Sequence, residues 1–197
     1  MHLSSFSDPL IDDLYPKQSR VTVDWCTAQV VPIFKGKGNP LDPASYRPIS
    51  LCSVLRKLME LCLYPDLLAT APELDPVQDG FRENRSTLDS ALALHELCRQ
   101  HTVDHHGEPP VLCFLDIQQA YDTVHRPVIW RALETHVSDP MLGILQSLFD
   151  NVKIETLVSG ARSPSFWPST AVLQGSILSP FLYSHYINTL PALLLPG

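Results

Sequence analysis

Eighteen prolines distributed along the 197 residues are the feature that most constrains how this chain can fold. Proline fixes φ and lacks a backbone N–H, so it interrupts helices and is poorly tolerated inside a sheet. Because these prolines are spread out rather than gathered in one tract, they predict many short elements separated by loops. Hydrophobic residues make up 45% of the chain, which is enough for a folded domain with a sizeable core.

Strands are predicted where β-branched and aromatic residues cluster or where apolar and polar residues alternate. The first such segment is 21–34, and the second is 152–160, where the alternation is clear. Residues 166–175 predict a strand that leads into a turn. The short apolar run VLCFLDI at 111–117 is bounded by turn signals, which is typical of a buried strand.

Helices are predicted where apolar residues recur at helical spacing. One such segment is 53–70, in which Pro65 is expected to kink or split the helix. Ser86 is a candidate N-cap, with Asp89 in the capping-box position three residues later. Further helical stretches lie near 127–137, 140–149 and 176–190. Together the helices and strands predict an α+β fold.

The charge pattern limits where nucleic acid could bind. A formal net charge of −7 argues against a large phosphate-binding surface, which needs clustered Lys and Arg. The segment 32–58 differs, because five basic residues and one acidic residue give it a local charge of +4 (five minus one). Gly, Pro, Asn and Asp predict a loop at 35–48 within it. A local basic patch on an acidic protein therefore stays possible.

The cysteines and the apolar runs bear on the compartment. The five cysteines are odd in number and lack close metal-ligand spacing, so they predict buried free thiols in a reducing compartment: Cys26, Cys52, Cys62, Cys98 and Cys113. The N-terminus has no basic region followed by an apolar run, so no signal peptide is expected. No apolar run approaches the roughly 18 residues of a membrane span, so no membrane association is expected.

The string VLCFLDIQQAYDTVHRP carries the most chemical information. It places Asp116 at the end of the predicted strand and Tyr121 five residues later. Nucleotidyl transfer uses divalent ions, and Mg²⁺ prefers hard oxygen ligands such as a carboxylate held on a rigid strand. An Asp after an apolar strand is also commonly a turn or cap residue. The string alone therefore leaves both roles open.

Four strings in this chain occur in the order and approximate spacing found in reverse transcriptases of non-LTR retrotransposons. They are VPIFKGKGNPLDPASYRPISL, LDPVQDGFRENRSTLDSA, FLDIQQAYDTVHR and AVLQGSILSPFLYSHYIN. Each is weak alone, but four in order are specific, and the resemblance covers roughly residues 25–190. The sequence therefore resembles an RNA-directed DNA polymerase that adds deoxynucleotides to a primer 3′ end by a two-metal mechanism.

The resemblance also implies an architecture, which is the fingers and a partial palm of a right-hand polymerase with the thumb absent. On this basis residues 1–20 are expected to be a loose N-terminal lead-in. Residues 21–110 would form a fingers-like region, and residues 111–197 would form a partial palm.

The resemblance implies roles for the residues of the palm strings. Asp116 would be the catalytic, metal-binding aspartate, with the backbone carbonyl of Ile117 as a further Mg²⁺ ligand. Tyr121 would lie beneath the sugar of the incoming nucleotide and exclude a 2′-hydroxyl, with ordinary core packing as the alternative. Gln174 would lie against the nucleotide and Gly175 would permit close backbone approach, with a plain strand-to-helix turn as the alternative.

Asp122 also belongs to the matching string. It is expected to stabilise the turn and to cap the following helix.

Two cations of the fingers contact the triphosphate in this family. Arg47 in YRPIS is the firmer match, and the lysine is either Lys35 or Lys37. Arginine offers a planar fork to phosphate and lysine a mobile point charge. A solvated loop is the alternative for these residues.

The string QDGFRENRST resembles the segment that supports the template strand. Its candidate template-binding residues are Gln78, Phe81, Arg82 and Arg85. Basic groups with an aromatic ring among them suit a single-stranded backbone and its bases. An ordinary polar loop before a helix is the alternative.

The family pattern continues with an aromatic-Ala-Asp-Asp turn after YIN-L, and no such turn occurs in the sequence. Two ions about 4 Å apart need several carboxylates, so Asp116 with one carbonyl should bind metal poorly. We therefore expect the chain by itself to be inactive as a polymerase. We also expect low stability and exposed apolar surface around 111–117, unless another polypeptide, such as the remainder of the polymerase, completes it.

Three interpretations compete. The first is a reverse transcriptase domain whose partners are an RNA template, a DNA primer and deoxynucleoside triphosphates, with a nuclear location implied by the resemblance. The second is a non-catalytic nucleic-acid-binding remnant of a retrotransposon. The third is a helical interaction module, which must treat four ordered matches as chance.

Overall fold

The computed structural model describes residues 23–194, and the predicted lead-in at 1–20 lies outside the described residues. The strands are β1 (Thr27–Phe34), β2 (Tyr46–Cys52), β3 (Lys153–Val158) and β4 (Ala161–Arg162). The α-helices are α2 (Val54–Thr70), α3 (Thr87–Asp104), α4 (Arg126–Leu133), α5 (Asp139–Asp150), α6 (Ser179–Tyr186) and α7 (Leu190–Leu194). Two 3₁₀ turns are η1 (Val23–Cys26) and η2 (Pro43–Ser45). Helices and a mixed sheet occur together, which confirms the predicted α+β class.

The four strands form one sheet in the order β2-β1-β3-β4. β1 and β2 form an antiparallel hairpin in which Pro32 lies opposite Pro48. β3 runs parallel to β1 and pairs only with residues 27–30. Pro32 therefore lies beyond the part of β1 that has neighbours on both sides, and its missing N–H does not interrupt the pairing of β1 with β3. The sheet joins strands from both sides of the division expected near residue 110, and that division stays a prediction.

Local signals for helix ends agree with the structure. The hydroxyl of Ser53 accepts a hydrogen bond from the N–H of Arg56 at the start of α2. Ser86 accepts from the N–H of Asp89 and donates to its carboxylate, which confirms the predicted capping pair. A split of the helix at Pro65, one of the two expected outcomes, is wrong, because α2 continues through this residue. Pro65 is exposed, so the carbonyl one turn earlier, which lacks its helical donor, can be hydrated.

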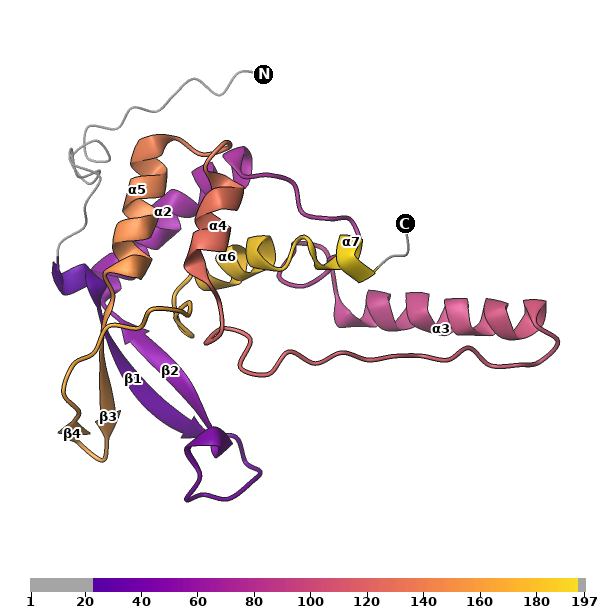
Figure 1. Cartoon of the computed structure of the whole chain (residues 1–197), viewed down its shortest axis with the longest axis horizontal. Helices are drawn as coiled ribbons and strands as arrows, with labels where there is room; N and C mark the ends of the chain where they lie inside the picture. Colours follow the sequence, from indigo (N-terminus) through magenta and orange to yellow (C-terminus); the bar gives the residue numbers. More distant parts are fainter. Residues whose placement is uncertain (1–22, 195–197) are drawn as a thin grey trace.

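The main core is made where α2, α4, α5 and α6 pack together beside one end of the sheet (Figure 1). Leu67 of α2, Leu133 of α4, Leu148 of α5 and Leu182 of α6 are all fully buried in it. A smaller hydrophobic cluster, which includes side chains of β1 and β3, contains Ala28, Val30, Val152, Ile154 and Leu173.

Two strand predictions are wrong. Residues 111–117 pair with no strand in the described part of the chain, and Val111 is 98% and Phe114 78% exposed. Residues 166–175 are irregular apart from a single bridge between Phe166 and Ile154. Both segments have suitable composition, but a strand also needs a neighbour for its N–H and C=O groups. The expected exposure of apolar surface around 111–117 is confirmed.

Helix α3 is an arm that projects from the rest of the molecule, and residues 105–120 return alongside it (Figure 1). None of its residues is buried. Three of its leucines are more than half exposed, namely Leu88, Leu92 and Leu97. The arm therefore adds little to the core described above.

The cysteines are free, as predicted, but they are not uniformly buried. Cys26 is buried, Cys52 and Cys98 are partly buried, and Cys62 and Cys113 are exposed. Separately, none of the helices within residues 23–194 combines the length and apolar content that a membrane crossing requires.

A buried ion pair connects the helices to the chain that leads into α6. Arg56 donates through Nε to Glu60 at 2.7 Å, and both side chains are completely buried. Glu60 also accepts hydrogen bonds from the hydroxyl of Ser176 (2.9 Å) and the N–H of Ile177 (2.7 Å). Arg56 also donates to the carbonyl of Leu148 at 3.0 Å. The pair thus links α2, α5 and the turn before α6.

Replacing Arg56 with methionine should lower the free energy of unfolding by about 3–5 kcal/mol, because Glu60 would remain as an uncompensated buried charge. Denaturant melts followed by circular dichroism measure this change. The matched control is Arg99→Met, which breaks an exposed pair with Glu96 and should change stability little. Equal losses in the free energy of unfolding for the two variants would contradict a stabilising role of the buried pair.

Candidate functional site

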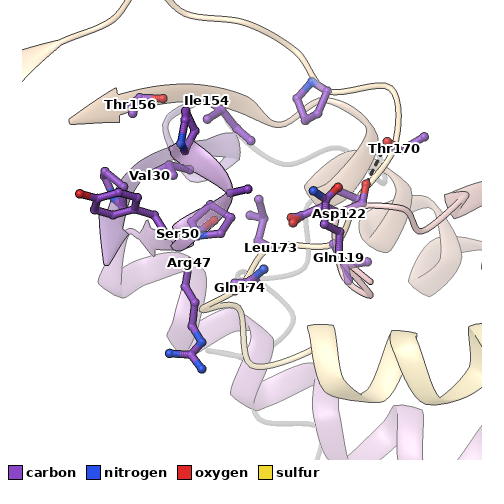
Figure 2. Close-up of a pocket in the computed structure, with 18 of the residues that line it drawn as sticks. Val30, Arg47, Ser50, Gln119, Asp122, Ile154, Thr156, Thr170, Leu173 and Gln174 are labelled. Carbon is purple, nitrogen blue, oxygen red and sulfur yellow. Dashed lines mark hydrogen bonds between the residues drawn. The ribbon is translucent and has the colours of Figure 1, made fainter. Parts of the chain in front are cut away.

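A cleft of about 740 Å³ lies between the β1–β2 hairpin and two irregular segments, 119–122 and 166–174. Figure 2 shows Val30 and Ile154 from the sheet on one side of it and Gln119 and Asp122 on the other. Leu173 lies between these two groups in the view. The sheet and the irregular segments therefore each contribute both apolar and polar side chains to the lining of the cleft.

Among residues 23–194, the cations that line this cleft are Lys35 and Arg47, and both come from the hairpin. Lys35 follows directly after β1, and its Nζ donates to the carbonyl of Ala44 at 2.8 Å. Arg47 lies in β2, opposite Ile33 of β1, and its side chain is exposed. Lys37 is exposed too but does not line the cleft. Of the two lysines left as alternatives by the sequence, Lys35 is the one beside Arg47 at the cleft.

Asp122 lies on the opposite wall, in a tight turn. The carbonyl of Gln119 accepts hydrogen bonds from the N–H groups of Asp122 (2.8 Å) and Thr123 (3.1 Å), and Gln119 has a φ of +52°. Burial raises the pKa of the Asp122 carboxyl, while a hydrogen bond from the Gln174 side chain and the charge of Lys35 act in the lowering direction. The carboxyl of Asp122 thus interacts with two side chains that are distant in the sequence, Lys35 and Gln174.

The predicted capping role of Asp122 is wrong, because the N-cap of α4 is His125. The carboxyl of Asp122 lies three residues earlier and lines the cleft instead. Residues 123–125 separate Asp122 from the first residue of the helix, Arg126.

Gln174 and Gly175 lie against β2. The carbonyl of Gln174 accepts a hydrogen bond from the N–H of Ser50 at 2.7 Å. Gly175 has a φ of +141°, and a Cβ at this position would overlap the carbonyl oxygen of Ser50. The expected close backbone approach is therefore made by strand β2, while the side chain of Gln174 lines the cleft.

Tyr121 does not line the cleft. Its half-buried ring packs against Tyr183 of α6, with centroids 5.2 Å apart, and lies 6.5 Å from the ring of Phe81. Burial raises the pKa of its phenol, and Tyr183 adds to the shift. In this conformation the ring of Tyr121 packs against the core, which was the alternative to lying beneath the sugar of a nucleotide.

The four candidate template residues gather in one loop before α3. Gln78 donates to the carbonyl of Ser184 at 3.1 Å, and Arg82 donates to the carbonyls of Asp75 and Gln78 at 3.2 Å. These two side chains therefore fold the loop and attach it to α6.

The other two candidates, Phe81 and Arg85, are more exposed. They line a second cleft of about 550 Å³, together with Arg82 and His185. Arg85 forms an ion pair with Asp79 at 3.4 Å. Burial lowers the pKa of His185 to about 4, with His136 adding to the shift, so this imidazole is neutral near pH 7.

Asp116 and Ile117 are exposed and line neither cleft. Among residues 23–194 no three His, Cys, Asp or Glu side chains come together as a metal site. A two-ion site needs several carboxylates close together, and Asp116 belongs to no such group among the described residues. The described residues thus do not fit the Mg²⁺ site that the resemblance implies.

Sequence reasoning missed Arg126, which is 4% exposed and donates to carbonyls of residues 168–171 near the cleft. One signal could have revealed it. A cation at the first position of a helix is unfavourable because the helix dipole is positive there. Its presence at the start of the predicted 127–137 helix indicates a partner elsewhere.

Replacing Gly175 with alanine should destabilise the fold more than replacing Gly36, because only Gly175 also meets a backbone atom. A positive φ costs a non-glycine residue about 1–3 kcal/mol, and the overlap with Ser50 adds to this at Gly175. Gly36 has a φ of +76° with open space around its Cβ position, so Gly36→Ala is the matched control. Denaturant melts that gave equal losses for both variants would contradict the close packing.

Comparisons with known proteins agree with the four strings. A family model described as reverse transcriptase (RNA-dependent DNA polymerase) matches residues 34–196. The RNA-directed DNA polymerase from mobile element jockey of Drosophila funebris is 31% identical over 173 residues, which cover 84% of this chain and 18% of that protein.

Two further relatives carry similar names. The probable RNA-directed DNA polymerase from transposon BS of Drosophila melanogaster is 31% identical over 180 residues, covering 90% of this chain and 19% of the relative. A retrovirus-related Pol polyprotein from type-1 retrotransposable element R2 of Popillia japonica is 29% identical over 179 residues, covering 90% and 25%. The chain thus spans a quarter or less of the length of these relatives. It belongs to the reverse transcriptase family, among the RNA-directed DNA polymerases of non-LTR retrotransposons.

Proposed function

We propose that the cleft binds a deoxynucleoside triphosphate and that the chain supplies the fingers and part of the palm of an RNA-directed DNA polymerase. One observation carries this proposal. Lys35, Arg47 and Gln174 each match one of the family's nucleotide-contacting positions in sequence. They line the same cleft although the first and the last are 139 positions apart in the chain (174 minus 35).

The chemistry of the cleft suits such a ligand. Lys35 and Arg47 offer a point charge and a planar fork to a polyphosphate. The apolar part of the cleft, with Val30, Ile154 and Leu173, can cover a sugar or base. Asp122 opposes an anion, but the raised pKa of its carboxyl lowers the cost of protonating it when the phosphates enter.

The second cleft is the proposed contact for a single-stranded template. Phe81 is 64% exposed and lies beside Arg85, so an aromatic face and a cation are available together. Bases stack on exposed aromatic rings, and cations follow the phosphate backbone. The proposed partners are thus an RNA template and a DNA primer, and the proposed setting is nuclear.

We further propose that the chain by itself binds nucleotide without joining it to a primer. Asp116 is exposed and apart from the cleft in the described conformation, and one carboxylate holds Mg²⁺ weakly. The two-metal mechanism of the proposal therefore requires further carboxylates brought next to Asp116.

Lys35→Ala should weaken binding of dTTP about tenfold, because a cation beside the phosphates is lost. The measurement is titration of the folded chain with fluorescently labelled dTTP, followed by anisotropy. Lys37→Ala is the matched control, since it removes the same charge from the same loop outside the cleft. Equal losses in the two variants would mean that only the overall charge of the loop matters.

Primer extension on an RNA template with Mg²⁺ tests the second part of the proposal. We expect the wild-type chain to bind dTTP and to add no nucleotide. Extension that disappears in Asp116→Ala would show that the chain catalyses by itself and would sink this part of the proposal. Absence of dTTP binding in a chain with an intact circular-dichroism melt would instead favour a remnant without a nucleotide site.

A further inference from the structure

Arg126 makes an unusually complete set of hydrogen bonds for a buried cation. Its Nε donates to the carboxylate of Asp150 at 2.7 Å. Its Nη2 donates to the carbonyl of Pro168 at 2.8 Å, and its Nη1 donates to the carbonyls of Thr170 (2.7 Å) and Ala171 (3.0 Å). The guanidinium therefore fastens residues 168–171, which have no strand partner, to helices α4 and α5.

The second partner of this arrangement, Asp150, is itself fixed. Its other carboxylate oxygen accepts a hydrogen bond from the indole N–H of Trp130 at 2.9 Å. Trp130 is buried in the main core. The orientation of the Arg126 fork is thus set by the packing of α4 against α5.

Ala171 has a backbone conformation that an alanine rarely adopts, with a φ of +86°. Such a conformation is strained for a residue with a Cβ and persists only where the surroundings fix it. Here the N–H of Ala171 donates to the carbonyl of Val124 at 2.9 Å, and its carbonyl accepts from Arg126. Hydrogen bonds therefore fix both peptide groups that flank the Cα of Ala171, which holds the strained conformation.

This strained residue lies between the cleft and Arg126. Thr170 donates through its hydroxyl to the carbonyl of Asp122 at 3.2 Å, a bond that Figure 2 shows beside the cleft. The N–H of Val172 donates to the carbonyl of Tyr121 at 3.0 Å. Leu173 and Gln174 follow directly and line the cleft. A shift at Ala171 would thus move both Asp122 and Gln174.

We propose that Arg126 is a positioning residue of the cleft, whose guanidinium holds the strained turn at Ala171 and so places Gln174 and Asp122 around the nucleotide. This inference rests on the proposed function. Arg126 touches no ligand in this account and acts only through the carbonyls of residues 168–171. Its effect should therefore appear in nucleotide affinity and in the local order of this segment.

The first test is Arg126→Lys in the full chain, assayed by anisotropy of labelled dTTP. Lysine keeps a positive charge near Asp150 but lacks the fork that reaches three carbonyls at once. We expect binding about tenfold weaker, as for the loss of one or two charge-assisted hydrogen bonds. Arg131→Lys, an exposed change on the same helix, is the matched control and should leave the affinity unaltered.

The second test is rescue by Ala171→Gly in the Arg126→Lys background. Glycine adopts a positive φ without strain, so the turn no longer needs the guanidinium to hold it. We expect most of the lost affinity to return. A double variant as weak as Arg126→Lys would overturn the strain mechanism.

Hydrogen exchange gives a readout that does not depend on nucleotide. In Arg126→Lys the amides of Ala171 and Val172 should exchange faster, while those of β1 and β2 should keep their wild-type rates. Faster local exchange with unchanged dTTP affinity would overturn the positioning role. No dTTP binding by the wild-type chain would refute the proposed function itself, whatever the exchange rates show.

A second variant, Asp150→Asn, tests the same proposal if Arg126→Lys fails to fold. Asp150→Asn keeps the shape of the anchor and removes the charge that orients the guanidinium. We expect weaker dTTP binding here too, with recovery on adding Ala171→Gly. Wild-type affinity in Asp150→Asn, with the chain folded and Arg126→Lys unfolded, would assign Arg126 a purely structural role.

Discussion

The fold depends on the burial of Arg56 against Glu60. Two opposite charges without solvent contact are tolerated only where hydrogen bonds replace the lost water, and here the replacements come from distant parts of the chain. Arg56 reaches the carbonyls of Trp25 and Leu148, and Glu60 reaches Ser176 and the N–H that follows it. The pair thus fixes the turn before α6, and with it the close contact between Gly175 and β2.

A second buried arginine has a comparable role for another part of the chain. Arg126 satisfies carbonyls of residues 168–171, which neither a helix nor a strand would satisfy. Irregular backbone can lie inside a protein only when its polar groups find such partners. The irregular segment from 166 to 175 therefore lies between two hydrogen-bond networks, each centred on a buried guanidinium. Lys35 and Arg47, in contrast, are exposed cations that line the cleft.

The sequence was a good guide to whatever is decided locally. The capping pair at Ser86 and Asp89 and the extent of α2 depend on residues within one or two turns, and both were predictable. The strand at 111–117 was not, because it needs a pairing partner that composition cannot reveal. The position of Asp122 was also missed, since it depends on the left-handed backbone at Gln119. The grouping of Lys35, Arg47 and Gln174 came only from ordered motifs, and periodicity alone would not have found it.

The parallel pairing of β1 with β3 has a consequence for how the cleft comes into being. It joins residues 27–30 to residues 153–156, across most of the described chain, whereas the β1–β2 hairpin closes a loop of only about a dozen residues. Closing a long loop costs entropy before its contacts repay it, so distant pairings tend to form late. The hairpin that carries both cations can thus form early. The cleft itself also needs β3 and the segment 166–174 in place, so nucleotide binding would report a late stage of folding.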